Sequence, residues 1–368
     1  MNDKPKALRA SATLFITLCL SAALACSGER GGAGPGGAPA GGGGAVNLRG
    51  AGASFPNPLY QKWLSEYGKV NPSARIDYQS IGSGGGIKQI KEQTIDFGAT
   101  DAPMKNEDMP APPAEILHIP TVLGAVVLTY NLQGVAQPLR FSSDVVADIF
   151  LGKVRRWDDP RIKADNPGVN LPAADITPVY RSDGSGTSAV FTDYLSKVSP
   201  EWKEKVGTGT SPKWPTGLGA KGNEGVTGQV KNTPNTVGYV ELAYAVQNRL
   251  PVALIKNASG NFVEPSLDAV TAAAAESLAT TPEDLRVSIT NAGGANAYPI
   301  SSYTYILAYK DQKDAAKGKA LVDFLWWGIH DGERFAKDLQ YAPLPPEIVK
   351  RAEAKINSIT SGGKPLRQ

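Results

Sequence analysis

Residues 181–188 read Arg-Ser-Asp-Gly-Ser-Gly-Thr-Ser and lead directly into the apolar run Ala189-Val190-Phe191. A turn of small residues that enters a helix leaves the first backbone N–H groups of that helix without partners, and the helix dipole adds positive potential there. Arg181 adds a planar cation that can hold two oxygens at once. The stretch therefore predicts a place for an anion at the start of a helix over residues 188–195.

Two earlier stretches have the same design. Residues 50–56 read Gly-Ala-Gly-Ala-Ser-Phe-Pro, where Pro56 suits the first helical position and Ser54 can cap the helix. Residues 82–86 read Gly-Ser-Gly-Gly-Gly before Ile87. One such turn is most often a simple helix cap, but three in one chain favour a shared site. Four hydroxyls add neutral donors, which suits reversible capture of a tetrahedral oxyanion; they belong to Ser54, Ser83, Ser185 and Thr187.

The sequence offers little support for other chemistries. It has no GxxxxGK[ST] element and no GxGxxG that opens a strand–turn–helix unit. Two His and two Cys are too few for a structural zinc site or a disulfide framework, and His118 and His330 have no companion pattern for a catalytic triad. A formal net charge of +3 over 368 residues gives no electrostatic footprint for nucleic acid. We therefore expect a binding protein that is not an enzyme and needs no metal or cofactor.

Short apolar runs alternate with amphipathic segments from Val46 onward, which is typical of an α/β protein. A chain of this length with 41% hydrophobic residues can bury two ordinary cores. The clearest helix is 56–70, where Tyr60, Trp63, Leu64 and Tyr67 share one face. We expect strands at 75–79, 122–130, 177–180, 237–240 and 303–309, and helices at 56–70, 86–92, 143–151, 188–195, 282–291 and 317–328.

The first 25 residues are typical of a secretory signal peptide. Basic residues precede an apolar run over 10–25, which at about 16 residues is too short for a membrane span. Cleavage fits after Ala25, and Cys26 then resembles a bacterial lipobox cysteine, although Ala23 stands where that pattern prefers Leu. Residues 28–44 are nearly all Gly, Ala and Pro, as in a flexible tether. We expect residues 1–25 to be a signal peptide and 26–45 a tether that is lipid-anchored through Cys26, with ordinary soluble secretion as the alternative.

The turns and several further motifs resemble the PstS family of periplasmic phosphate-binding proteins. The resemblance runs in order through essentially the whole mature chain, over residues 50–56, 82–86, 96–103 (Asp-Phe-Gly-Ala-Thr-Asp-Ala-Pro), 151–158, 181–188, 214–223 and 237–244. It implies a type II periplasmic-binding-protein fold, in which two α/β lobes are joined by crossing strands and the ligand lies in the cleft. The implied lobes are 46–129 plus 302–368 for lobe I, and 130–301 for lobe II.

The same resemblance implies a function and a set of ligands. A monomer would bind inorganic phosphate in the periplasm or cell envelope, attached to the membrane by its lipid anchor, and deliver the ion to the permease subunits of an ABC importer. Asp183 would pair with Arg181, unless it only shapes the turn. By motif position, the phosphate ligands would be Ser54, Phe55 (through its backbone N–H), Ser83, Asp101, Arg181, Ser185, Gly186 and Thr187.

Three other functions stay open from the sequence. A receptor of the same fold for sulfate or another oxyanion would differ at Asp101, since a fully ionised anion has no proton to give that carboxylate. An exported phosphatase would use Ser185 or Ser83 as nucleophile and would need a base or metal beside the hydroxyl. A phosphate-sensing or adhesive surface protein would share every binding residue with a transport receptor.

Overall fold

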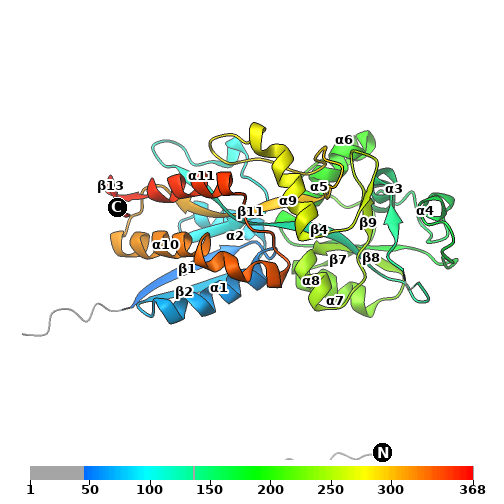
Figure 1. Ribbon diagram of the computed structural model, residues 1–368, viewed down its shortest axis with the longest axis horizontal. Helices are drawn as coiled ribbons and strands as arrows, with labels where there is room; N and C mark the ends of the chain where they lie inside the picture. The colour runs from blue at the N-terminus through cyan, green and yellow to red at the C-terminus, as the bar shows by residue number, and fades with distance from the viewer. Residues whose placement is uncertain (1–44, 136, 368) are drawn as a thin grey trace, which may run out of the picture. The chain divides into compact units, whose positions relative to one another are not determined.

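The computed structural model describes residues 45–135 and 137–367, so the predicted signal peptide and Cys26 lie outside the described residues. The chain is mixed α/β (Figure 1). Its strands are β1 (Val46–Gly52), β2 (Ala74–Ser80), β3 (Phe97–Thr100), β4 (Ile116–Asn131), β5 (Arg140–Phe141), β6 (Thr177–Arg181), β7 (Leu218–Ala220), β8 (Thr236–Glu241), β9 (Leu254–Lys256), β10 (Phe262–Val263), β11 (Ser301–Tyr309), β12 (Thr360–Ser361) and β13 (Lys364–Pro365). Its α-helices are α1 (Asn57–Val70), α2 (Ser83–Lys91), α3 (Ser143–Phe150), α4 (Pro160–Asp165), α5 (Gly186–Val198), α6 (Pro200–Lys205), α7 (Gly222–Asn232), α8 (Leu242–Gln247), α9 (Leu267–Ser277), α10 (Ala315–Gly328) and α11 (Pro346–Asn357).

One long strand, β4, links two groups of elements. The strand order of the main sheet is β2-β1-β3-β11-β4-β8-β6-β7. The first part of β4, up to Ala125, pairs with β11, and the part from Val126 onward pairs with β8. In Figure 1 the elements β1, β2, α1 and α10 lie on one side of this change of partner, and β7, β8, α3 and α7 lie on the other. This is the arrangement of two α/β lobes joined by crossing strands, while the residues at which one lobe ends and the other begins stay a prediction.

Parallel pairing produces the turns that matter for function. β1 pairs in parallel with β2 and β3, and β6 pairs in parallel with β7 and β8. Each parallel crossover needs a connection that returns along the sheet, and here α1 and α2 provide it between the first three strands. The strands β1, β2 and β6 therefore end where α1, α2 and α5 begin.

Aromatic packing fixes α1 to the sheet, as its helical periodicity predicted. Leu59, Tyr60, Trp63 and Tyr67 are buried, and Leu64 is partly buried. The rings of Tyr60 and Trp63 stack with centroids 5.6 Å apart, and the Trp63 indole N–H donates to the Gly332 carbonyl at 2.8 Å. Tyr67 packs edge-on against Phe324 of α10 at 5.3 Å. Buried indole and phenol groups that keep a polar partner add stability without an unsatisfied donor.

All five expected strands are present, and one expected helix is wrong. Residues 282–291 form no helix, because Leu285 has a φ of +64° and Asn291 a φ of +57°. Leu285 and Ile289 are both buried. Their side chains anchor an irregular segment that precedes β11. Within the described ranges, no helix is both long and apolar enough to cross a membrane.

Candidate anion-binding site

The three predicted turns all lie at the carboxyl ends of parallel strands, where open α/β sheets bind their ligands. Residues 53–56 leave β1 for α1, residues 81–82 leave β2 for α2, and residues 182–185 leave β6 for α5. All of the predicted ligands are buried; they are Ser54, Phe55, Ser83, Asp101, Arg181, Ser185, Gly186 and Thr187.

Helix capping explains only one of the serines. Ser185 is the N-cap of α5, and its Oγ accepts from the Ser188 N–H at 3.0 Å. The residues at the N-caps of α1 and α2 are Pro56 and Gly82, and neither helix start has a side-chain capping bond. The expectation that Ser54 caps α1 is therefore wrong. Ser54 and Ser83 are buried hydroxyls that contact other parts of the site.

The turn before α5 packs directly against the second turn and against Asp101, which follows β3. The Gly84 N–H donates to the Gly184 carbonyl at 2.8 Å. A Cβ built on Gly186 would lie 2.2 Å from Ser83 Oγ and 2.4 Å from Asp101 Oδ2. Only a glycine permits this approach, because real Cβ atoms do not come within 3.0 Å of other heavy atoms.

The first turn reaches the third through Asn223, a fully buried residue at the start of α7. Asn223 Nδ2 lies 2.9 Å from Ser54 Oγ and 3.1 Å from Thr187 Oγ1. Phe55 is held at the same place, because the Tyr341 hydroxyl donates to its carbonyl at 2.6 Å. The structure thus gathers all of the predicted ligands around the ends of β1, β2, β3 and β6.

Arg181 is the buried cation of the site. Its Nε and Nη2 donate to the two carboxylate oxygens of Asp183 at 2.7 and 2.5 Å, and its Nη1 lies 3.4 Å from Thr187 Oγ1. Asp183 also accepts from the Gly222 N–H at 3.0 Å. Burial by itself would raise the pKa of Asp183, but the hydrogen bonds and charge of Arg181 outweigh it and hold that pKa below its usual value. The bidentate pair fixes the guanidinium plane, so the charge of Arg181 is presented in one orientation.

Asp101 is a carboxyl group within this cluster. The Thr304 hydroxyl donates to its Oδ1 at 2.9 Å, and Ser83 Oγ lies 3.4 Å from its Oδ2. Burial raises its pKa to about 7, although hydrogen bonds from Thr304 and Ser83 and the charge of Arg181 act in the opposite direction. Asp101 therefore gains or loses its proton near neutral pH.

The hydroxyls of the site are arranged as donors. Ser54 and Thr187 each accept from Asn223 Nδ2, Ser83 accepts from the Asp101 N–H at 3.3 Å, and Ser185 accepts from the Ser188 N–H. Among residues 45–135 and 137–367, none accepts a hydrogen bond from the hydroxyls of Ser54, Ser185 or Thr187. These hydrogens are free for an acceptor-only ligand, which is what an ionised oxyanion is.

Two contacts of the site were missed from the sequence. Asn223 follows Gly222, whose φ is +74°, at the point where the chain leaves β7 through Lys221 and enters α7. The motif at 214–223 carries the same signal, a glycine at the start of a helix. Thr304 lies within the apolar run of β11 and reaches Asp101 only because β11 pairs with β3, which the sequence does not reveal.

A cavity of about 600 Å³ reaches the edge of the site. Its lining includes Gly84, Asp101 and Ser302 on one side and Ala189 and Val190 of α5 on the other. Asp101 is the one predicted ligand in the lining of this cavity.

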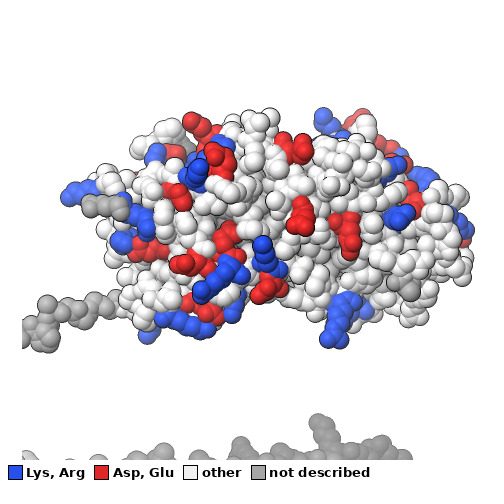
Figure 2. Space-filling view, viewed as in Figure 1, with Lys and Arg blue, Asp and Glu red and all other residues white. Residues whose placement is uncertain are grey.

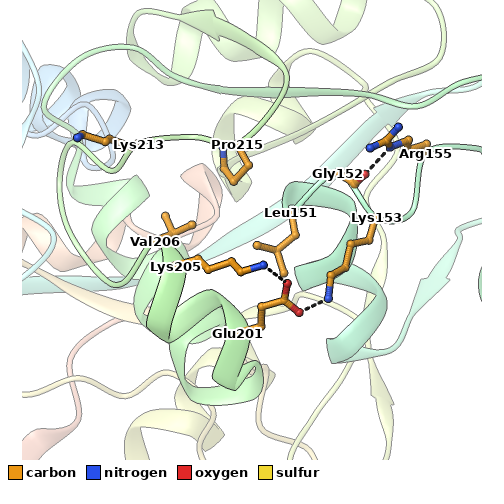
Figure 3. A pocket seen from close by; sticks show the side chains of 9 residues that line it. All are labelled: Leu151, Gly152, Lys153, Arg155, Glu201, Lys205, Val206, Lys213 and Pro215. Carbon is orange, nitrogen blue, oxygen red and sulfur yellow. Dashed lines mark hydrogen bonds and ion pairs between the residues drawn. The ribbon is translucent and has the colours of Figure 1, made fainter.

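A second pocket, of about 620 Å³, contains none of the predicted ligands. It is lined by cations, among them Lys153, Lys205 and Lys213 (Figure 3). Glu201 contacts Lys153 and lies 2.8 Å from Lys205, so part of this charge is already neutralised. Positive and negative side chains are likewise interspersed on the face in Figure 2, which agrees with the small net charge.

Comparisons with known proteins agree on one family. A model of the PBP superfamily domain matches residues 37–326. The phosphate-binding protein PstS of Xylella fastidiosa (strain 9a5c) is 46% identical over 310 residues, 84% of each chain. The phosphate-binding protein PstS of Pasteurella multocida (strain Pm70) is 46% identical over 327 residues, 88% of this chain and 94% of the relative. The solved structure of a phosphate-binding protein from Stenotrophomonas maltophilia matches 84% of this chain and 94% of its own, with a TM-score of 0.64 at 20% identity. The predicted fold class is confirmed.

Proposed function

This chain belongs to the PstS family of phosphate-binding proteins, and on that premise we propose that it binds inorganic phosphate outside the cytoplasmic membrane and delivers it to an ABC importer. One observation carries the proposal most directly: hydroxyl donors and one guanidinium, which is fixed by Asp183, are buried in one cluster with the carboxyl group of Asp101. Donors suit the ionised oxygens of phosphate, and the carboxyl group suits the P–OH that phosphate still carries near neutral pH.

Each predicted ligand then has a role. The hydroxyls of Ser54, Ser83, Ser185 and Thr187 and the backbone N–H groups of Phe55 and Gly186 donate to phosphate oxygens. Arg181 supplies the positive charge, held in place by Asp183, and Asp101 accepts the phosphate proton. Helix N-termini at α1, α2 and α5 add favourable potential without further cations. Weak, numerous donors of this kind favour release as well as capture.

We propose binding without catalysis. A serine nucleophile needs a base that takes the proton of its hydroxyl. His118 Nε2 accepts from the Met104 N–H at 3.0 Å, and burial lowers the pKa of His118 to about 3. His330 contacts the Trp326 carbonyl and Glu353. Neither histidine contacts a hydroxyl of the site. Asp101 Oδ2 lies 3.4 Å from Ser83 Oγ, but in this proposal Asp101 accepts the phosphate proton instead of activating Ser83, which favours a receptor over an exported phosphatase.

The proposed function is tested by calorimetric titration of the mature protein with phosphate, arsenate and sulfate. We expect phosphate and arsenate to bind with one-to-one stoichiometry and sulfate to bind far more weakly, because only the first two bring a proton for Asp101. Small-angle scattering should show a smaller radius of gyration with phosphate, since ligands from both lobes contact the anion together only when the lobes approach. Absence of heat and of compaction at millimolar phosphate would count against the proposal.

We propose that residues 46–129 plus 302–368 form lobe I and residues 130–301 lobe II, and that the protein is tethered in the periplasm or cell envelope. The tether follows from Cys26 and the Gly-rich stretch behind it. A lipid on Cys26 would keep the receptor at the membrane that holds its permease.

The anchor gives a separate prediction. If Cys26 is lipidated, the mature protein should partition into membranes and detergent, and Cys26→Ala should alter that processing. The matched control is Cys19→Ala, since Cys19 lies inside the predicted signal peptide and should be absent from the mature chain. Mass spectrometry settles the outcome: an unmodified mature N-terminus would rule out the lipid.

A further inference from the structure

The side-chain amide of Asn223 is held in one orientation, so that its Oδ1 and Nδ2 atoms cannot exchange places. Its Oδ1 accepts from the Glu241 backbone N–H at 3.0 Å, which fixes the oxygen end of the amide. Its Nδ2 must then face Ser54 Oγ and Thr187 Oγ1. The side chain is fully buried, so water does not replace these bonds.

Each of the two hydroxyl oxygens that Asn223 contacts faces two hydrogen-bond donors. Ser54 Oγ lies 2.9 Å from Asn223 Nδ2 and 3.3 Å from the Asn223 backbone N–H. Thr187 Oγ1 lies 3.1 Å from Asn223 Nδ2 and 3.4 Å from Arg181 Nη1. A hydroxyl has two acceptor lone pairs and one hydrogen. When both lone pairs face donors, the hydrogen is the group that remains for a ligand.

We infer that Asn223 is a specificity-determining positioning residue, which turns the hydroxyls of Ser54 and Thr187 into obligatory donors toward an ionised oxyanion. The inference rests on the proposed phosphate-binding function and deepens it. Ser54 precedes α1 and Thr187 lies in the first turn of α5, so one amide sets the hydrogen-bond direction on both sides of the anion.

A neutral amide orients the two hydroxyls better than a charged side chain would. A Lys at this position would donate too, but it would bring a second cation and would bind the anion directly. A carboxylate would accept from both hydroxyls, so their hydrogens would turn away from the anion. A neutral amide that cannot flip is the side chain that orders two hydroxyls without adding charge.

The test is a double-mutant cycle on phosphate affinity, measured by calorimetry on the mature protein. Asn223→Ala in the native background should weaken phosphate binding about tenfold, the usual loss when hydrogen bonds to a charged ligand are disordered. In the Ser54→Ala/Thr187→Val background the same change should weaken it less than about threefold, because the hydroxyls through which Asn223 acts are gone. A residue with a general structural role would cost the same in both backgrounds.

Asn166→Ala is the matched control. Asn166 is also a buried asparagine with both ends bonded, to the Arg140 N–H and carbonyl and to the Ile162 carbonyl, none of them near the site. It should lower the melting temperature and leave phosphate affinity unchanged. If Asn223→Ala does not fold, the cycle uses the isosteric Asn223→Asp, which keeps an acceptor for the Glu241 N–H and should lose more affinity than alanine.

Equal losses in the two backgrounds, or no loss in the native one, would overturn the inference about Asn223 while the phosphate function stands. A native protein that does not bind phosphate would instead overturn the proposed function.

Discussion

Replacing Gly186 by alanine is expected to weaken phosphate binding by at least about a hundredfold while leaving each lobe folded. The new Cβ would lie 2.2 Å from Ser83 Oγ, 2.4 Å from Asp101 Oδ2 and 2.8 Å from Asp101 Cγ. Gly186 opens α5, and a methyl group is compatible with a helical backbone. The clash therefore arises only between the turn before α5 and the elements that carry Ser83 and Asp101, and moving these apart relieves it. An overlap in a packed site costs about 3 kcal/mol, which is roughly a hundredfold in affinity.

Gly68→Ala is the control for this variant. Gly68 lies in α1, and a Cβ there would meet no atom within 4 Å. Calorimetry should show unchanged affinity for Gly68→Ala and the large loss for Gly186→Ala. Scattering at saturating phosphate should find the native protein compact and Gly186→Ala expanded. Native affinity in the Gly186→Ala protein would mean that the close approach of Gly186 to Asp101 is not part of the bound state.

The second large effect concerns Asp101 and the choice between phosphate and sulfate. A carboxylate beside a bound anion is repulsive unless the anion brings a proton, and phosphate near neutral pH does so while sulfate does not. While Asp101 is ionised, a penalty against sulfate of about 4 kcal/mol corresponds to roughly a thousandfold in affinity. Asp101→Asn should remove most of that gap, because the amide can donate to an unprotonated oxygen. Phosphate affinity should change little, since the amide oxygen still accepts the P–OH.

The pH dependence of sulfate binding tests the same mechanism without a mutation. Burial raises the pKa of Asp101 to about 7, so the carboxyl group gains its proton as the pH falls below that value and can then donate to sulfate. Sulfate affinity of the native protein should fall by up to about tenfold for each pH unit above 7 and should level off below that pH, where Asp101 is already protonated. Asp101→Asn should bind sulfate equally at every pH in this range. If that variant still rejects sulfate as strongly as the native protein does, Asp101 does not select phosphate by accepting its proton.

Local sequence patterns predicted those parts of the site that are built from residues adjacent in the chain. Strand-to-helix turns could be predicted at residues 50–56, 82–86 and 181–188. Glycines there permit the backbone conformations of a tight turn, and hydroxyl side chains can bond to nearby backbone groups. Asn223 gave the same signal and could have been found, because Gly222 precedes it at the start of a helix. Thr304 could not, since its contact with Asp101 depends on the antiparallel pairing of β11 with β3.

The helix predicted over residues 282–291 is absent because of contacts between distant parts of the chain. Pro282, Glu283 and Asp284 suit the first turn of a helix, but the β-branched residues and the alternating apolar positions that follow them do not support a helix over 282–291. The partners of this segment are distant in sequence: the Tyr305 hydroxyl donates to the Val287 carbonyl at 3.3 Å, and Arg286 donates to the Met104 carbonyl at 3.0 Å. Tertiary contacts of this kind override a weak local preference.

The place of β11 in the sheet bears on the order in which the chain can fold as it is synthesised. β11 is the neighbour of both β3 and β4, yet it arrives some 170 residues after β4 along the chain. As soon as residue 241 has emerged, β8 can pair with the end of β4, β6 with β8 and β7 with β6, whereas β3 has no link to β4 before residue 309. Contacts between such distant segments form late, because the intervening chain must be ordered first. The strands β1, β2 and β3 would thus stay unjoined to β4 on the ribosome until most of the chain is made, so this part of the fold is the last to close.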